Sequence, residues 1–142
     1  MMFYGRLIKQ ANYQLATEFD RFAAPYDLTG TQMSVIDFLG RQEDYCSSQQ
    51  TIEREFRIRR STTTILLQRM EKKGLIVKKV VAGDQRRRLV QLTAKATELI
   101  PVIREHITAS EDWLQAGFTA SEREVITAFL QRAIRGNEND DQ

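Results

Sequence analysis

The chain has 142 residues, of which 42% are hydrophobic and 28% are charged, and its formal net charge is +2. This length fits one domain with a buried core, and no apolar run approaches the roughly 20 residues that cross a bilayer, so we expect no membrane protein. The first residues lack a secretory signal pattern and the single cysteine, Cys46, permits no internal disulfide, which together favour a cytoplasmic protein.

Two helices are expected before residue 41. The segment from Phe3 to Phe22 has apolar residues three and four positions apart, the spacing of one helix face, and Pro25 ends it. The second helix follows a capping-box pattern, Thr29-Gly30-Thr31-Gln32, in which the first and last side chains can satisfy free amides at the helix start. Gly40 helps to end this helix. Its apolar face has four members: Val35, Ile36, Phe38 and Leu39.

A helix-turn-helix is expected next. Ser47 and Ser48 are candidate caps for a helix from Gln49 to about Phe56, and a second helix runs from about Arg60 to Lys73. In the second helix one set of side chains has the spacing of an inward face: Thr63, Leu66, Leu67 and Met70. The remaining set is expected to face outward: Ser61, Thr62, Thr64, Ile65, Gln68 and Arg69.

Two strands and two further helices complete the expected elements. Gly74 suits a left-handed helix cap, 75–81 and 89–92 read as strands, and 82–85 reads as the turn between them. A helix over about 94–114 is expected to kink at Pro101, and a last helix starts at the capping box Thr119-Ala120-Ser121-Glu122. The fold class is therefore mainly α with a small β-wing, a winged helix-turn-helix.

The charge is divided unevenly along the chain. Residues 54–95 contain thirteen Lys or Arg and three acids, a net of +10, so the remainder carries −8. A charged run is usually a solvated face, but this excess coincides with a motif that fits a DNA groove, which favours nucleic acid. The cations are spread over helices and a hairpin, so a membrane surface is the weaker alternative.

The outward face of the second helix of the pair has the side chains that DNA recognition uses. Gln can bond adenine and Arg can bond guanine through two groups each, and Ile65 can touch a thymine methyl. A plain solvated surface is the alternative. In the wing, Arg86, Arg87 and Arg88 repel one another unless an anion such as a phosphate lies opposite. Asp84 either orients a nearby arginine or is an ordinary turn residue.

These residues resemble the MarR family of bacterial transcriptional regulators. The resemblance covers nearly the whole chain and is carried by Leu28-Thr29-x-x-Gln32, Arg60-Ser61-Thr62, the segment Met70 to Ile76, Asp84-x-Arg86 and Leu92-Thr93. The chain departs from the family pattern at Ile65, where Arg or Lys is common, and at Ile52-Glu53, where Leu-Ala is common.

The resemblance implies a single domain over 1–142, with a DNA-binding lobe at about 29–93 and dimerisation helices at about 1–24 and 94–135. It implies a homodimer on a palindromic operator, acting as a repressor that a small aromatic or phenolic effector releases. It also implies that Arg86 enters the minor groove and that Asp84 helps to position the wing tip. The complete predicted DNA-binding set is Arg60, Ser61, Thr62, Thr64, Gln68, Arg69, Asp84, Arg86, Arg87 and Arg88.

A DNA-binding regulator that an effector releases has three alternatives. An enzyme is disfavoured because no phosphate loop, metal-protease motif or nucleophile elbow occurs, and no cofactor, catalytic group or metal is expected, since His106 and Cys46 are too few for a nitrogen and sulfur site. A winged-helix module that binds protein and a DNA-binding protein without an effector stay open. Tyr13, Phe38 and Trp113 line a ligand pocket or, as we favour, belong to the core. A redox role for Cys46 is disfavoured, because its neighbours are serines and not a basic cluster.

Overall fold

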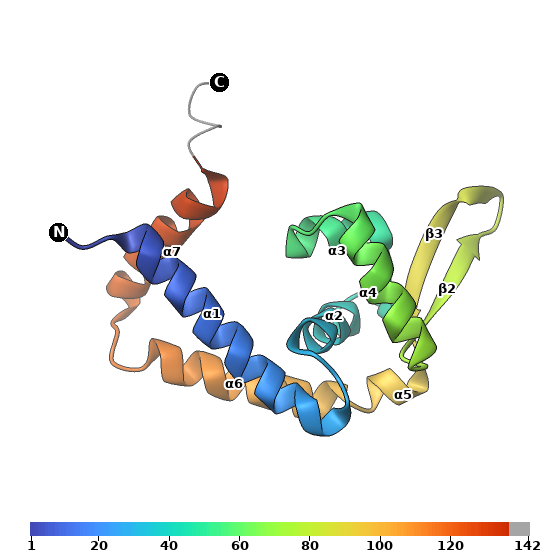
Figure 1. Ribbon diagram of the computed structural model, residues 1–142, viewed down its shortest axis with the longest axis horizontal. Helices are drawn as coiled ribbons and strands as arrows, with labels where there is room; N and C mark the ends of the chain where they lie inside the picture. The colour runs from blue at the N-terminus through green and yellow to red at the C-terminus, as the bar shows by residue number, and fades with distance from the viewer. Residues whose placement is uncertain (137–142) are drawn as a thin grey trace. The chain divides into compact units, whose positions relative to one another are not determined.

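The computed structural model describes residues 1–136, with the side chains of 85–87 outside the description. The chain forms two compact units, Met1–Arg104 and Glu105–Gln142. The helices are α1 (Tyr4–Ala23), α2 (Gly30–Gly40), α3 (Gln49–Phe56), α4 (Arg60–Lys72), α5 (Ala94–Thr97), α6 (Ile100–Gln115) and α7 (Ala120–Arg135) (Figure 1). Two short 3-10 turns, η1 (Ala24–Tyr26) and η2 (Glu43–Tyr45), accompany the strands β1 (Cys46–Ser48), β2 (Ile76–Val81) and β3 (Asp84–Leu92). The predicted fold class, mainly α with a small β-wing, is confirmed.

The corner between α1 and α2 forms as its sequence predicts. Pro25 lies in η1, and the Thr29 capping box is complete: the Thr29 hydroxyl accepts from the Gln32 amide at 3.1 Å, and the Gln32 side chain accepts from the Thr29 amide at 3.1 Å. The Asp20 carboxylate of α1 accepts from the Gly30 amide at 2.7 Å. These bonds satisfy free donors at the start of α2 and fix α1 against it.

The sheet is antiparallel, with the strand order β1-β3-β2. β1 was not among the expected strands: Cys46 pairs with Gln91 and Ser48 pairs with Leu89. The turn predicted over 82–85 is present but covers only 82–83, and the returning strand predicted over 89–92 starts earlier, because β3 begins at Asp84 and its backbone includes the arginine run. The register slips between Val80 and Val81, an irregularity that strand propensity does not reveal.

The core of Met1–Arg104 lies where α2, α3, α4 and the sheet meet. Its largest buried side chains have almost no exposed surface: Met33, Ile36, Leu39, Ile52, Leu67, Met70, Leu75, Ile76 and Ile103. Burial of a side chain of this size is worth about 1.5–3 kcal/mol each. Thr63 is buried among them, and its hydroxyl is satisfied because it donates to the Arg59 carbonyl at 2.9 Å. These contacts hold the helix pair on the sheet.

The helix expected over 94–114 is two helices. α5 ends at Thr97, and α6 begins at Ile100 with Pro101 in its first turn. The break precedes the proline and is not a kink at it, because the ring crowds the carbonyl four residues back and its missing amide is harmless in a first turn. Between the two helices the Leu99 amide donates to the Ala96 carbonyl at 3.0 Å.

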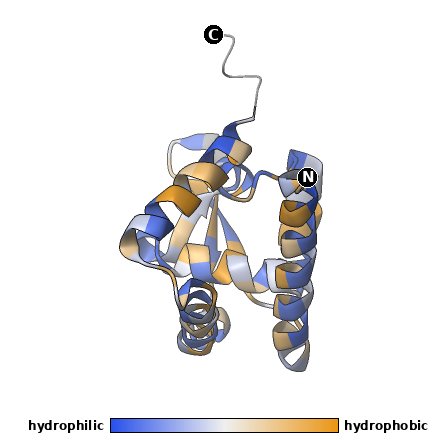
Figure 2. Cartoon of the chain, turned by 90° about the vertical axis from the view of Figure 1, so that its left-hand side faces the viewer, coloured by the Kyte–Doolittle hydropathy of each residue, from blue (hydrophilic) through white to orange (hydrophobic). Residues whose placement is uncertain are grey.

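Several helices keep apolar side chains on the surface of the chain. On α7 the members exposed by 40% or more are Val125, Ile126, Phe129, Leu130 and Ile134. Phe3, Leu7, Tyr13 and Leu15 are similarly exposed at or near α1. In Figure 2 the helix that starts at the N-terminus carries hydrophobic and hydrophilic turns along its length. In the described part of the chain no helix is long and apolar enough to cross a membrane.

Candidate nucleic-acid interface

A tight turn joins α3 to α4. The Ser48 hydroxyl caps α3 by accepting from the Thr51 amide at 3.1 Å, and Arg57 ends the helix in the left-handed region at φ 51°. The Ile58 amide then donates back to the Glu53 carbonyl at 3.1 Å. This cap turns the chain within three residues, so that α4 starts at Arg60 and packs against α3. The predicted helix-turn-helix is therefore present.

The predicted inner and outer faces of α4 are largely right. Thr63, Leu67 and Met70 are buried, whereas Leu66 is only partly covered. Of the side chains predicted to face outward, all but one are exposed: Ser61, Thr62, Ile65, Gln68 and Arg69. Thr64 is the exception because it is half-buried at the edge of the helix that faces α3.

The outer set does not form one uniform surface. Arg60 and Thr64 line a groove of about 700 Å³ beside α3, together with Ser48 and Arg88. Thr62, Ile65 and Arg69 instead line a second groove of about 470 Å³, which reaches Asp20 and the start of α2. Ser61 and Gln68 line neither groove. The predicted recognition face is thus a ridge with a groove on either side.

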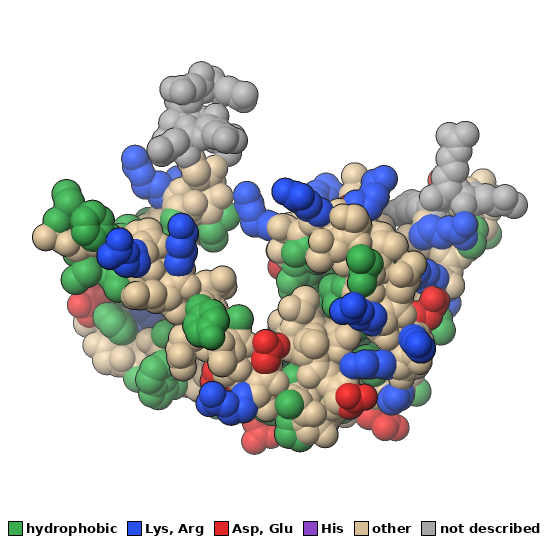
Figure 3. Space-filling view, viewed as in Figure 1, with side chains coloured by type: hydrophobic (Ala, Val, Ile, Leu, Met, Phe, Trp, Pro, Cys, Tyr) green, Lys and Arg blue, Asp and Glu red, His purple; other side chains and the backbone are tan. Residues whose placement is uncertain are grey.

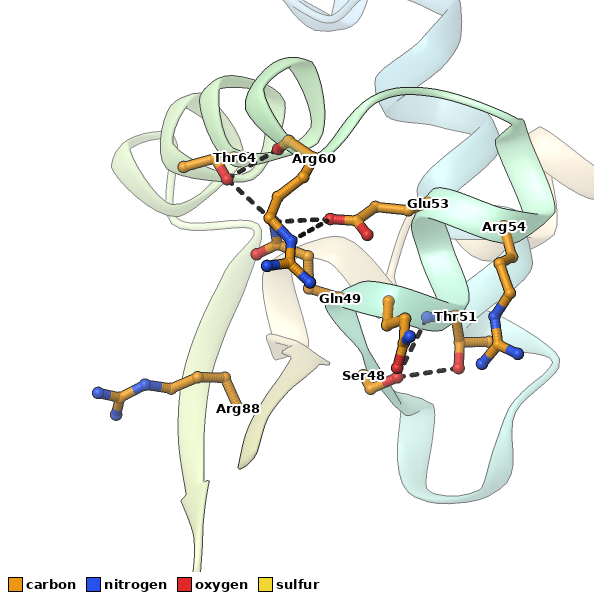
Figure 4. A pocket seen from close by; sticks show the side chains of 9 residues that line it. Ser48, Gln49, Thr51, Glu53, Arg54, Arg60, Thr64 and Arg88 are labelled. Carbon is orange, nitrogen blue, oxygen red and sulfur yellow. Dashed lines mark hydrogen bonds and ion pairs between the residues drawn. The ribbon is translucent and has the colours of Figure 1, made fainter. Parts of the chain in front are cut away.

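The first groove has an ordered polar wall. Gln49 of α3 donates from Nε2 to the Thr64 hydroxyl at 3.0 Å and to the Glu53 carboxylate at 3.3 Å. The Arg60 Nε lies 3.6 Å from the same carboxylate oxygen, and the Thr64 hydroxyl donates to the Arg60 carbonyl at 2.9 Å. Figure 4 shows the Arg60 guanidinium beside Glu53, with Arg88 on the neighbouring strand pointing away from them. The wall therefore joins α3 to the first turn of α4.

The wing is anchored at its base. Gly74 takes φ +76°, and its carbonyl accepts from the Thr93 hydroxyl at 2.6 Å, while the Thr93 amide donates to the Leu75 carbonyl at 3.0 Å. These bonds tie the first residues of the hairpin to the residue after it, so the hairpin projects from a fixed base.

Near the end of the hairpin Asp84 and Arg88 are exposed, and Lys78 and Lys79 are exposed on β2. The predicted contacts of Arg86 and Arg87 lie outside the described residues. Of the three predicted wing arginines, the structure therefore places the Arg88 side chain.

Cations outnumber acids over α3, α4 and the strands, as Figure 3 shows on its right-hand side. Some of these cations already have partners within the protein. Lys73 donates to the Asp27 carbonyl at 2.5 Å, and Lys95 donates to the Lys73 carbonyl at 2.7 Å. These two lysines fasten the end of α4 to neighbouring segments, which leaves the hairpin and the outer side of α4 as the surface for an anion.

Other candidate residues are dispersed. Cys46 lies half-buried in β1, and His106 is half-buried in α6. No group of three His, Cys, Asp or Glu that could hold a metal occurs in the described part of the chain. Phe38 is half-buried and meets the Phe56 ring edge-on at 5.8 Å, as a core residue does, whereas Tyr13 is 73% and Trp113 is 78% exposed.

The structure adds groove residues that the sequence interpretation missed. Gln49, Glu53 and Arg54 of α3 line the first groove, although only α4 and the wing were expected to supply contacts. Positions 49 and 53 are four residues apart, which is the signal that Gln49 and Glu53 share one face of α3. It identifies a face, but not that this face turns toward Arg60.

The sequence and the fold are similar to those of known proteins. A model of the MarR family matches residues 26–87. The HTH-type transcriptional regulator PecS of Dickeya dadantii (strain 3937) is 30% identical over 115 residues, which are 80% of this chain and 69% of that protein.

Two solved structures extend the comparison. The transcription regulator MarR of Oenococcus oeni PSU-1 is 40% identical, with a TM-score of 0.84 over 94% of this chain and 100% of that one. A complex of MepR of S. aureus with DNA shares the fold, with a TM-score of 0.87 and 22% identity over 95% of this chain and 98% of that one. The resemblance seen in the sequence is thereby confirmed, and the chain belongs to the MarR family.

Proposed function

We propose that the protein is a transcriptional regulator that binds double-stranded DNA through α4 and the wing. The observation that carries the proposal is the exposed outer side of α4, which presents Ser61, Gln68 and Arg69 on a helix, an element that a major groove admits, beside a hairpin with exposed cations. The structure of the relative MepR with DNA supports the same class of partner. The cytoplasm, where bacterial DNA is accessible, is the location that fits this role.

Each predicted contact residue has a role in the proposal. Ser61, Thr62, Gln68 and Arg69 read base edges or hold the adjacent phosphates, and Arg60 and Thr64 do so from the groove beside α3. Arg88 and, by family resemblance, Arg86 and Arg87 contact the backbone or minor groove, with Asp84 orienting the hairpin end. The DNA-binding lobe spans about residues 29–93.

The active species in this proposal is a homodimer. The exposed apolar side chains of α1 and α7 are more than an isolated chain usually leaves in water, and a second copy would cover them. Dimerisation helices at about 1–24 and 94–135 and a palindromic operator follow from that symmetry. Repression, and release by a small aromatic or phenolic effector, are the parts of the proposal that family membership supports.

Fluorescence anisotropy of a labelled duplex tests the proposal. The duplex comes from the region upstream of the protein's own gene and is titrated at several salt concentrations against a scrambled duplex. We expect binding that prefers the upstream sequence and a steep linear fall of log affinity with log salt, because counterions leave the DNA on binding. Absence of any salt-sensitive DNA binding would instead support a module that binds protein.

Two substitutions distinguish residues that recognise base pairs from residues that bind the DNA backbone. Gln68→Ala is expected to alter the preference among duplexes, by about 1–3 kcal/mol at the affected base pair. Arg86→Ala is expected to weaken binding to all duplexes alike and to lower the salt slope by about one. The control is Tyr26→Phe, which removes a hydroxyl from an exposed residue of η1 outside both the lobe and the dimerisation helices and should change neither quantity. Equal affinities of Arg86→Ala and wild type at moderate salt would contradict the role of the wing.

A further inference from the structure

The groove beside α3 contains an acid where the surrounding surface is basic. The Glu53 side chain is only 13% exposed, whereas the Arg60 side chain next to it is 80% exposed. The same groove is lined by Arg54 and Arg88. A carboxylate in this position reduces the positive charge near a phosphate bound at the start of α4 and therefore weakens binding to phosphates in general.

Glu53 is held in place, and it in turn restrains Arg60. Its Oε1 accepts from Gln49 Nε2 at 3.3 Å and lies 3.6 Å from Arg60 Nε (Figure 4). Gln49 also bonds the Thr64 hydroxyl, one turn along α4 from Arg60. The ion pair involves the Nε of Arg60, and a guanidinium has further N–H donors on its two terminal nitrogens with which it can bind another partner.

We propose that Glu53 is a positioning residue for DNA recognition, because it restrains Arg60 on the wall of the groove. Arg60 then contributes binding energy to DNA of the preferred sequence (matched DNA) and contributes little to DNA of other sequences (unmatched DNA). The inference rests on the proposed DNA-binding function and adds to it a residue that determines specificity.

The charge and burial of Glu53 affect the two kinds of complex differently. Unmatched binding comes almost entirely from Lys and Arg that neutralise phosphates, and such contacts demand side chains free to reach the nearest phosphate. If Arg60 left the wall, it would leave a mostly buried carboxylate without its cation, and that separation is unfavourable. Matched DNA that places an acceptor beside the groove can bond Arg60 without this separation. Glu53 therefore penalises the unmatched complex more than the matched one.

The test uses the 142-residue chain with two probes: a duplex selected from a random pool by the wild-type protein, and a scrambled duplex of the same composition. Affinities are measured between 50 and 200 mM salt for wild type and Glu53→Gln. We expect tighter binding of the scrambled duplex by the variant, with a salt slope steeper by ~0.9 for each Arg60 that reaches a phosphate. The ratio of matched to scrambled affinity is expected to fall by roughly fivefold or more, since one misdirected contact is worth about 1 kcal/mol or more.

Three further variants identify the cause. Glu55→Gln removes the same charge from an exposed position of α3 and should leave the affinity ratio unchanged. Glu53→Asp keeps the charge but withdraws the carboxylate from Arg60, so its ratio should fall as in Glu53→Gln. In an Arg60→Ala background, Glu53→Gln should change the ratio no further.

The inference is overturned if Glu53→Gln keeps both the wild-type ratio and the wild-type salt slope. It is also overturned if Glu55→Gln reproduces the effect, or if the effect persists without Arg60. If the wild-type protein selects no duplex, the proposed DNA-binding function itself is wrong. If the wild type binds DNA and the Glu53 variant has the same affinity ratio and salt slope, only the role of Glu53 is wrong.

Discussion

Leu67 and Ile65 lie two residues apart on α4 and differ completely in environment. Leu67 is fully buried, whereas Ile65 is 50% exposed. Leu67→Ala is expected to lower the free energy of unfolding by about 2–5 kcal/mol, because it removes buried methyl groups and leaves a cavity. Ile65→Ala is the matched control and should change that free energy by no more than about 0.5 kcal/mol. Urea denaturation measures both, and a comparable loss in the two variants would contradict the orientation of α4.

Residue by residue, the orientation of α4 was predictable, but the neighbourhood of each side chain was not. Helical spacing alone places Leu67 inward and Gln68 outward. It cannot reveal that Thr64 bonds Gln49, or that Glu53 faces Arg60, because these contacts depend on how α3 packs against α4. The candidate site was thus predicted as residues of α4 and the wing, and the structure adds the groove wall that α3 supplies.

At the scale of elements, the end of α4 depends on one backbone conformation. Gly74 takes φ +76°, and a Cβ built there would lie 4.0 Å from the Lys95 side chain, so space is not the obstacle. Gly74→Ala is expected to destabilise the protein by about 1–2 kcal/mol through backbone strain alone. Gly5→Ala in α1 is the control: a Cβ there meets nothing within 4 Å, and it is expected to stabilise the helix by up to about 1 kcal/mol. Thermal unfolding of the two variants should therefore shift in opposite directions.

The start of α7 has a pH-dependent cap. The pKa of Glu122 is lowered, first by the hydrogen bond that its carboxylate accepts from the Thr119 amide and then by the Thr119 side chain. A lowered pKa in the folded state means that the cap stabilises α7 above the ordinary glutamate pKa, and that this stabilisation is lost as the pH falls through the lowered value. Helicity by circular dichroism should therefore decrease in acid more in wild type than in Glu122→Gln. Glu124→Gln, on the same helix, should behave as wild type.

Elements with a strong local signal were predictable, and those set by distant partners were not. The capping boxes at Thr29 and Thr119 mark helix starts that the structure confirms. β1 has only three residues and exists because β3 offers it an edge, so no pattern in Cys46 to Ser48 reveals it. Pro101 was correctly read as a disruption, but whether it kinks or divides a helix depends on the turn before it.

At the scale of the whole molecule, we predict a dimer that a single acidic substitution on α7 disrupts. Ile126 is 40% exposed on the apolar side of α7 in the single chain. Ile126→Glu is expected to raise the dimer dissociation constant by at least about a hundredfold, since an unpaired buried carboxylate costs several kcal/mol. Light scattering after size-exclusion chromatography measures the mass of each species.

The matched control is Gln131→Glu, which places the same charge on a polar position of the same helix. It should remain as dimeric as wild type. A monomeric wild type, or an Ile126→Glu variant that stays dimeric, would contradict the assignment of this face to a second copy. In the monomeric variant only one half of a palindrome can be occupied at a time, so DNA affinity should fall with the dimer.

The short strand β1 couples the wing rigidly to the helices α3 and α4. Its last residue, Ser48, both pairs with Leu89 of β3 and caps the first turn of α3. A tilt of the hairpin must therefore carry the start of α3 with it. The distance between the hairpin and the helices α3 and α4 is therefore set within the lobe before any partner binds. A longer or shorter hairpin in a relative would change how far the hairpin extends without changing the orientation of these helices.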